Sequence, residues 1–437
     1  MPVALDPQAL KAVQQSRRAV EAAIERGETM YGVNTGFGKL AHVRIPAEQG
    51  RQLQLNLIRS HASGVGEPLA QDAVRAMMLL RANVLMRGSS GVRPVLPELL
   101  VEMLNRGIHP TVPSQGSVGA SGDLAPLSHL ALAMIGEGDV RVSNPITLEA
   151  KEGLAFVNGT QAQTGLAALL VTDAWTLWRT AHAAAAMSLE AVRGSPDPFD
   201  ARIHDARPHP WQQRSAALLR ELLTDSEIRE SHRENDPRVQ DAYSLRCTPQ
   251  VLGAVGEGLA FAERLVVIEL NAATDNPLVF GDEIMSGGNF HGQPIALALD
   301  VIGIALTTLA GLAERRIERI VNPDLSSGLP PFLARNAGVE SGFMTPQIAA
   351  AALVAECRVL ATPASVQSVP TEGNQEDVVP MGMTAAWKAE RILANAVRIV
   401  AVELLAAAQG LEFLKPLRPA RRVAHAYATV RSLVAAA

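Results

Sequence analysis

The chain contains few aromatic residues and few cysteines. Only 4% of its 437 residues are Phe, Trp or Tyr, and its two cysteines are Cys247 and Cys357. Such a low aromatic content is unusual for an all-β protein. Two cysteines imply no disulfide framework and fit a reducing compartment, so we expect a cytoplasmic protein.

The chain also lacks a charge excess and the common catalytic templates. Its net charge of −5 offers no electrostatic basis for binding nucleic acid or an anionic membrane, and its first residues do not resemble a signal peptide. Ten histidines include neither a His-Glu-x-x-His pattern nor a Cys/His cluster, so we expect no metal site. Phosphate-binding and dinucleotide-binding fingerprints are missing, and Asp123 rules out a Gly-x-Ser-x-Gly elbow around Ser121.

One apolar run is long enough to cross a membrane. Residues 294–313 are apolar apart from Asp300 and two threonines. Asp300 lies inside the run, and charged residues continue its helical register after residue 313. A helix that is apolar on all sides is also typical of the centre of a large soluble bundle. We therefore interpret this run as buried core.

Helical periodicity dominates the rest of the chain and predicts a mainly α protein. A composition shift near 194–210 predicts an N-terminal region, 1–195, and a long-helix bundle region, 196–437. Glycine-rich breaks carry most of the unusual polar residues, as expected for functional loops on a helical scaffold. The expected helices cover residues 7–26, 69–87, 160–193, 248–274, 293–321, 345–361 and 381–409.

The most informative segment is Ala120-Ser121-Gly122, within a glycine-rich loop. Glycine at 122 allows the backbone to bend until its amide nitrogen reaches the Ala120 carbonyl carbon. Ring closure with loss of the Ser121 hydroxyl would leave a methylidene-imidazolone, an electrophile that needs no external cofactor. A plain flexible loop followed by a helix start at Asp123 is compatible with the same residues.

Two of the three tyrosines lie in informative segments. Tyr31 opens a glycine-rich loop, Tyr-Gly-Val-Asn-Thr-Gly-Phe-Gly, and Tyr243 lies in Val-Gln-Asp-Ala-Tyr-Ser-Leu-Arg. A phenol acts as a general base when its surroundings lower its pKa, although most tyrosines only pack. Arg246 follows Tyr243 by three residues, so the two would share a helix face. An arginine fork suits a carboxylate, and an ordinary interhelical salt bridge is the alternative.

Further polar clusters occur in three loops. Residues 374–377, Asn-Gln-Glu-Asp, lie between two apolar helical patterns and could equally be a solvated turn. Asn158-Gly159-Thr160 and the segment ending at Phe290 are turn-like and could be purely structural.

The run Gly116–His129, Gly-Ser-Val-Gly-Ala-Ser-Gly-Asp-Leu-Ala-Pro-Leu-Ser-His, resembles the signature of the aromatic amino acid ammonia-lyases. The resemblance extends in order from Tyr-Gly-Val-Asn-Thr-Gly-Phe-Gly at 31–38 to Glu-Leu-Leu-Ala-Ala-Ala-Gln at 403–409. It implies a central helical bundle with a smaller N-terminal region that carries the prosthetic-group loop. It also implies a homotetramer whose active sites borrow residues from neighbouring chains.

Two positions favour L-histidine as the substrate within this family. His61 stands where relatives specific for phenylalanine or tyrosine usually have leucine, and Glu376 where phenylalanine-specific relatives usually have glutamine. Both ring nitrogens of an imidazole need partners, which these side chains can supply. A phenyl ring would leave them unpaired. The expected reaction is non-oxidative elimination, giving trans-urocanate and ammonia, the first step of histidine degradation.

The resemblance also assigns roles by position. Ala120, Ser121 and Gly122 would form 4-methylidene-imidazol-5-one, and Tyr31 would remove the β-proton, with Glu376 as a competing acid–base candidate. The expected substrate-binding residues are His61 and Glu376 for the imidazole, Arg246 and Asn158 for the carboxylate, and Tyr243, Gln240 and Phe290 around the electrophile and the leaving amine.

The chain departs from the family pattern after Glu376. It reads Val-Val-Pro-Met at 378–381, where His-Val-Ser-Met is commoner, and its 138–148 connection is short. Two alternatives stay open: a tyrosine or phenylalanine lyase or aminomutase, and a homologue that forms no ring and acts as a scaffold. His61 and Glu376 argue against the first alternative.

Overall fold

The computed structural model describes residues 2–436 and confirms a mainly helical fold. The chain divides into two compact units, each made of three segments. Unit 1 comprises residues 1–169, 263–300 and 363–387, and unit 2 comprises residues 170–262, 301–362 and 388–437. The division at 195/196 expected from composition stays a prediction about regions of the sequence.

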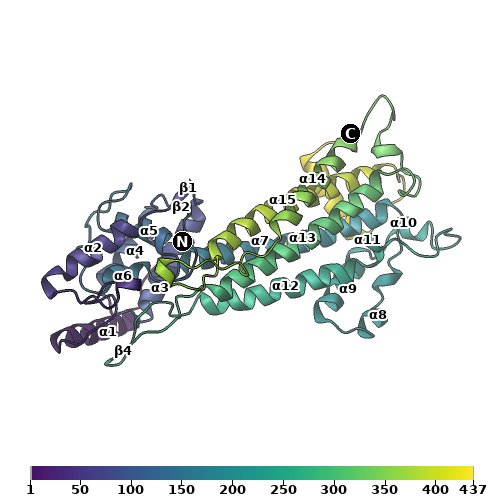
Figure 1. The fold of residues 1–437 in the computed structure, drawn as a ribbon. Coiled ribbons are helices and arrows are strands. Elements are labelled where there is room, and N and C mark those ends of the chain that lie inside the picture. Colours follow the sequence, from purple (N-terminus) through teal and green to yellow (C-terminus); the bar gives the residue numbers. More distant parts are fainter. Residues whose placement is uncertain (1, 437) are drawn as a thin grey trace. The chain divides into compact units, whose positions relative to one another are not determined.

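Unit 1 is built from short helices and two small antiparallel sheets. Helices α2, α5 and α6 pack against one another, and α3 packs against α4 (Figure 1). Strand β1 pairs with β2, and β3 forms a hairpin with β4. The elements of unit 1 are α1 (Pro7–Glu25), η1 (Gly38–Leu40), η2 (Ala47–Gln49), α2 (Gly50–His61), β1 (Val65–Pro68), α3 (Gln71–Met86), α4 (Val95–Arg106), β2 (Pro113–Gln115), α5 (Leu124–Met134), α6 (Glu152–Val157), β3 (Leu278–Phe280), β4 (Glu283–Met285) and η5 (Glu372–Asn374).

Four long helices contribute most of their length to unit 2, where α12, α13 and α15 run side by side (Figure 1). Small residues allow this close packing: a Cβ on Gly258 would lie 3.4 Å from the Ala305 side chain, and Gly303 faces Ile392. The helices are α7 (Gln161–Ala191), α12 (Thr248–Glu269), α13 (Gln293–Val321) and α15 (Gly382–Glu412). The other elements are η3 (Asp197–Phe199), α8 (Ala201–Asp205), α9 (Pro210–Leu222), α10 (Glu227–Glu230), α11 (Tyr243–Arg246), η4 (Pro331–Leu333), α14 (Met344–Leu360) and α16 (Arg421–Leu433).

The apolar run at 294–313 lies in α13. By length and composition α13 and α15 could each cross a membrane, but 67% and 61% of their most apolar windows are buried within the protein. Asp300 is buried there and accepts hydrogen bonds from the backbone N–H groups of Ala364 and Ser365. A buried carboxylate with such partners is a structural element of a core, which supports the interpretation of this run.

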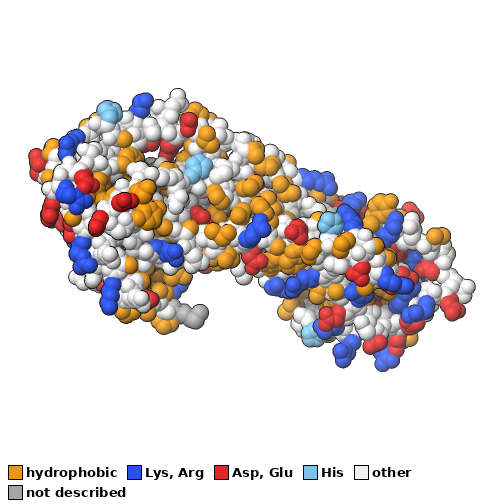
Figure 2. Space-filling view, turned by 90° about the horizontal axis from the view of Figure 1, so that it is seen from below, with side chains coloured by type: hydrophobic (Ala, Val, Ile, Leu, Met, Phe, Trp, Pro, Cys, Tyr) orange, Lys and Arg blue, Asp and Glu red, His pale blue; other side chains and the backbone are white. Residues whose placement is uncertain are grey.

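Acidic and basic side chains are mixed on the face of the protein that Figure 2 displays. Some of the surface ion pairs join two helices, such as Arg391 on α15 with Glu356 on α14 at 2.7 Å, and both side chains of that pair are at least partly exposed. Exposed pairs of this kind contribute little to stability because water already solvates both charges.

A different ion pair lies inside unit 2. Arg316 on α13 forms two hydrogen bonds with Glu403 on α15, one of them of 2.9 Å between Nη2 and Oε2. Ser188 on α7 donates to the same carboxylate at 2.8 Å, and all three residues are buried. Three long helices are therefore joined by one buried charge pair.

Replacing Glu403 by leucine is expected to lower the free energy of unfolding by about 3–5 kcal/mol, because Arg316 would remain as a buried, uncompensated charge. Denaturant unfolding followed by circular dichroism measures this loss. Glu356→Leu, which removes an exposed partner, is the matched control and is expected to cost at most about 1 kcal/mol. The double variant Arg316→Met/Glu403→Leu is expected to regain most of the stability. Equal losses for Glu403→Leu and Glu356→Leu would contradict the expectation.

Candidate active site

The tripeptide Ala120-Ser121-Gly122 lies in a bend immediately before α5. Gly122 has a φ of +77°, and a Cβ at this position would overlap the backbone of Gly159. The two glycines form a parallel bridge, and the Asp123 N–H donates to the Gly159 carbonyl at 2.7 Å. Only glycine allows this approach, so the bend predicted from Gly122 has a specific structural cause.

Asn158, at the C-terminal end of α6, reaches the same tripeptide. Its Nδ2 donates to the Ser121 carbonyl at 2.9 Å, whereas its buried Oδ1 has no hydrogen-bond partner among residues 2–436. The expectation for Asn158 was help in binding a substrate carboxylate. In the structure its donor lies on the Ser121 carbonyl oxygen, where a fixed donor stabilises negative charge, and the role in carboxylate binding stays a prediction.

Arg81 on α3 fixes the segment around Asn158 by hydrogen bonds. Its guanidinium donates to the carbonyls of Asn158, at 3.1 Å, and Ala155, and to Oε1 of Gln161. Arg81 is fully buried, and burial lowers its pKa to about 10. The sequence signal for it is weak, because Arg81 is one of two arginines in α3 and the local pattern does not distinguish it from Arg75.

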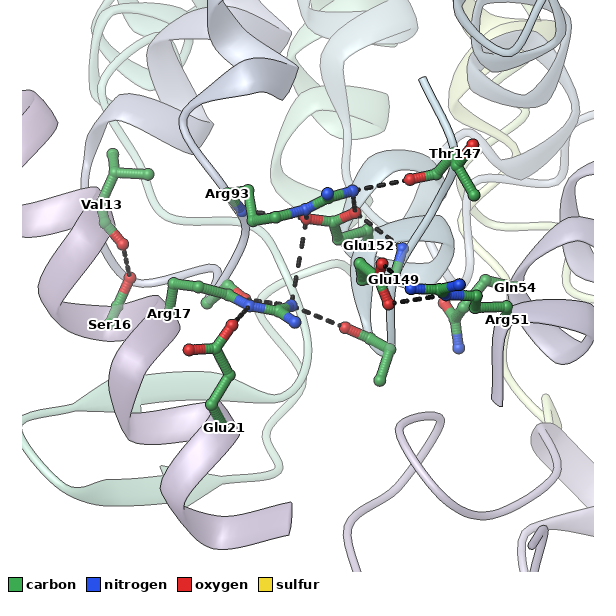
Figure 3. A network of polar contacts seen from close by, with 12 residues as sticks. Val13, Ser16, Arg17, Glu21, Arg51, Gln54, Arg93, Thr147, Glu149 and Glu152 are labelled. Atoms are coloured by element: carbon green, nitrogen blue, oxygen red, sulfur yellow. Dashed lines mark hydrogen bonds and ion pairs between the residues drawn. The ribbon is translucent and has the colours of Figure 1, made fainter. Parts of the chain in front are cut away.

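A second polar network fixes the N-terminal end of α6 (Figure 3). The buried carboxylate of Glu152 accepts two hydrogen bonds from the Arg93 side chain, at 2.7 and 2.8 Å. Arg17 on α1 lies 4.0 Å from the same carboxylate and donates to the Ala150 carbonyl. Helix α6 is thus held at its start by Glu152 and at its end by Arg81.

Asp123 does not cap α5 as the sequence suggested. The helix does begin at Leu124, but the Asp123 side chain makes no capping bond. Its buried carboxylate instead accepts from the Gln163 backbone N–H at 2.9 Å and from the Ser117 hydroxyl at 3.2 Å. Burial raises the pKa of Asp123 to about 7, against the hydrogen bonds from Gln163 and Ser117, which lower it.

A cavity of about 420 Å³ opens beside the tripeptide within unit 1. Of the predicted site residues, it brings together Tyr31, Ala120, Ser121, Phe290 and Glu376. The remaining lining residues are Gly38, Ala41, Asn276, Ser286, His291, Glu372, Gln375, Asp377 and Val378.

Glu376 and Tyr31 form the polar walls of this cavity. Glu376 accepts from the Ser121 hydroxyl at 2.5 Å and from the Thr371 hydroxyl at 2.6 Å. The Tyr31 hydroxyl accepts from the Gly38 backbone N–H at 3.0 Å. Burial raises the pKa of Tyr31 and the Gly38 hydrogen bond lowers it, while the charges of Glu372 and Glu376 raise it further.

His61 ends α2 and is not among the cavity-lining residues. Its Nδ1 lies 2.9 Å from the Leu57 carbonyl. Because a carbonyl only accepts, Nδ1 carries the proton in this bond, and Nε2 is the acceptor of the neutral ring. Burial lowers the pKa of His61, while the Leu57 hydrogen bond and, to a smaller extent, the charge of Glu376 raise it. His61 is therefore within electrostatic range of Glu376.

Gln240, Tyr243 and Arg246 belong to unit 2 and do not line the unit 1 cavity. The Arg246 guanidinium lies 4.7 Å from the centre of the Tyr243 ring, which confirms that the two share a face of α11. Gln240 and Tyr243 line a separate cavity of about 870 Å³ in unit 2. Tyr243 is 71% exposed.

Known proteins resemble this chain over nearly its whole length. The chain matches a family described as aromatic amino acid lyase over residues 1–432. It is 52% identical to the curated histidine ammonia-lyase of Koribacter versatilis (strain Ellin345), over 99% of this chain and 89% of that protein. The solved histidine ammonia-lyase of Trypanosoma cruzi has a TM-score of 0.91 and 42% identity, covering 100% of this chain and 85% of the other. Tyrosine aminomutase from Streptomyces globisporus has a TM-score of 0.93 and 44% identity, covering 100% and 89%.

The raised pKa of Asp123 predicts a pH dependence of stability. The folded pKa is about 7, while the ordinary value is 3.8. Between these values the folded state binds more protons, so the free energy of unfolding contributed by Asp123 falls as the pH rises. The stability difference between the wild type and Asp123→Asn should therefore change by at most about 1.4 kcal/mol per pH unit between pH 4 and 7. Denaturant unfolding at several pH values tests this. Asp282→Asn, in the exposed β3–β4 turn, is the control, and a wild-type curve parallel to that of Asp123→Asn would refute the expectation.

Proposed function

The chain belongs to the aromatic amino acid lyase family, and from that premise we propose that it removes ammonia from L-histidine to give trans-urocanate. It is a carbon–nitrogen lyase. The observation that carries the proposal is the Ala120-Ser121-Gly122 bend, with the Asn158 donor on its carbonyl and the Glu376 carboxylate beside it. The identity of 52% to curated histidine ammonia-lyases supports the choice of substrate.

The residues around the tripeptide fit a methylidene-imidazolone formed from Ala120, Ser121 and Gly122. Ala120 is small and buried, and Gly122 adopts the conformation that a bend requires. Closure joins the Gly122 nitrogen to the Ala120 carbonyl carbon, and two water molecules are lost in all. Once formed, the ring would supply an electrophilic methylene in a protein whose standard side chains offer none.

The other side chains would orient the substrate and move its protons. Tyr31 is proposed as the base that removes the β-proton, and the Gly38 N–H that binds its hydroxyl also stabilises the phenolate. Glu376 stays an alternative acid–base group because its carboxylate also lines the cavity. Phe290 covers one wall of the same cavity and would shield the reacting centre from water.

We assign recognition of the imidazole to His61 and Glu376. Nε2 of neutral His61 and the carboxylate of Glu376 both accept hydrogen bonds. An imidazole ring offers an N–H donor, and an imidazolium offers two. A phenyl ring has neither, and it would leave the Glu376 carboxylate without a donor from the substrate.

Gln240, Tyr243 and Arg246 complete the proposed site from a neighbouring chain. We propose a homotetramer with shared active sites, in which Arg246 binds the substrate carboxylate and Tyr243 and Gln240 face the leaving amine. The resemblance to the family supports this arrangement, as does the exposure of Tyr243 in the single chain. A cytoplasmic location is part of the same proposal, and both cysteines are free thiols.

The deciding experiment adds L-histidine to the purified protein without metal or nucleotide and follows the ultraviolet absorption of urocanate. Ser121→Ala is expected to reduce the rate by about 10³-fold or more without unfolding the protein, because no electrophile can form. The intact mass of the wild type should be lower than its sequence mass by two water molecules, and that of Ser121→Ala should equal its sequence mass.

Ser341→Ala, an exposed serine, is the matched control and should keep both the wild-type rate and the mass deficit. Near-normal turnover by Ser121→Ala would rule out the mechanism. Formation of cinnamate from L-phenylalanine or coumarate from L-tyrosine, with no urocanate from L-histidine, would show that the proposed substrate is wrong. If the protein formed no product from any of these amino acids and had an unmodified mass, the result would favour a homologue that forms no ring and acts as a scaffold.

His61→Leu tests the choice of substrate. We expect kcat/KM for L-histidine to fall by about 10- to 100-fold, because the imidazole loses an acceptor, while turnover of L-phenylalanine rises relative to it. His425→Leu, an exposed histidine on α16, should leave both rates unchanged. An unchanged ratio between the two substrates in His61→Leu would remove His61 from substrate recognition.

A further inference from the structure

Glu372 opens η5 in an unusual backbone conformation. Its φ is +50°, and the next two residues, Gly373 and Asn374, have φ values of +62° and +66°. Glycine and asparagine adopt this left-handed region readily, but for a glutamate it costs of the order of 1–3 kcal/mol. The turn therefore holds Glu372 in a conformation that its own backbone disfavours, and strain of this kind concentrates at functional sites.

The Glu372 carboxylate lies directly over Gly38. A Cβ at Gly38 would overlap the carboxylate oxygens, so the two groups fit together only because residue 38 is glycine. The Gly38 N–H is the donor to the Tyr31 hydroxyl, at 3.0 Å. Glu372 thus packs against the residue that orients the proposed base, and all three residues line the same cavity.

Several charged and titratable groups surround Tyr31. The charges of Glu372 and Glu376 both raise the pKa of the Tyr31 hydroxyl. Asp377 and His291 line the same cavity. Lys39 follows Gly38 in the chain and lies close to the turn that contains Glu372. Its Cγ would be 3.7 Å from a Cβ built at Gly373. Within residues 2–436 no ion pair neutralises Glu372, whereas Glu376 accepts from two hydroxyl groups.

We propose that Glu372 is a positioning residue of the elimination: its carboxylate packs over Gly38, whose N–H donates to the Tyr31 hydroxyl, and it places a negative charge in the cavity that Tyr31 lines. The proposal rests on the proposed function, in which Tyr31 removes the β-proton. It adds an acidic group outside the site residues inferred from the sequence.

The physical basis is the repulsion between a carboxylate and a phenolate. A negative charge beside a phenol disfavours its ionisation, and the charge of Glu372 raises the pKa of Tyr31 in the same direction as burial does. Since a base must be unprotonated to accept a proton, the rate rises with pH as Tyr31 ionises. Neutralising Glu372 should therefore move this rise to lower pH.

The first test compares the pH dependence of kcat/KM for L-histidine in the wild type, Glu372→Gln and Glu372→Asp. In Glu372→Gln the acid limb is expected to move to lower pH, with a gain of about two- to tenfold at the foot of the limb. Glu372→Asp keeps the charge and should keep the wild-type limb. Glu48→Gln, which removes an exposed carboxylate from η2, is the control for net charge.

The second test titrates the tyrosines by their tyrosinate absorbance and needs no turnover. The chain has only three tyrosines, so subtracting the curve of Tyr31→Phe isolates Tyr31. Glu372→Gln should ionise Tyr31 at lower pH than the wild type, whether or not the protein acts on L-histidine. This readout separates the two proposals, because the titration can shift even if no urocanate forms.

Three results would overturn the role of Glu372. The first is an unchanged acid limb together with an unchanged titration in Glu372→Gln. The second is a uniform loss of kcat at all pH values with an unshifted titration, which would make Glu372 purely structural. The third is an equal shift in Glu48→Gln, which would reduce the effect to net charge.

Discussion

The close approach of Gly122 to Gly159 is the contact on which the rest of the site depends. It brings the end of α6 against the reactive tripeptide, so the Asn158 side chain can donate to the Ser121 carbonyl. Neither glycine has a side chain that would separate the two backbones. Arg81 holds one side of this contact and the Asp123 backbone the other. The tripeptide is thus fixed by the close approach of two backbones.

Much of this rigidity comes from charges buried in unit 1. Arg81, Lys151 and Asp275 are all buried, and Lys151 pairs with Asp275 at 2.9 Å. Burying such groups opposes folding unless each finds partners, and here backbone carbonyls and carboxylates provide them. Carbonyls bound by a fixed guanidinium cannot rotate toward water. The segment from α6 to α7 consequently presents its donors in one orientation, and preorganisation of this kind favours catalysis by electrostatics.

The helical scaffold could be predicted from the sequence because its helices are long and strongly periodic. The patterns at 293–321 and 345–361 match α13 and α14 to within a residue. The tripeptide was predictable because the backbone bend needs glycine. Arg81 and Glu372 were not, since their partners lie far away in the sequence: Arg81 contacts a turn 74 to 80 residues later. The sequence likewise could not show that three segments far apart in the chain make up each compact unit.

The hydrogen bond between Ser121 and Glu376 has a consequence for the order of events. While the serine keeps its hydroxyl, one oxygen of Glu376 is occupied by a donor from the same chain. Ring formation, as proposed, discards that donor as water. An incoming imidazole would meet this oxygen beside the serine donor before ring formation, and without that donor afterwards. The proposed ring formation would therefore free one acceptor position of Glu376 for the substrate.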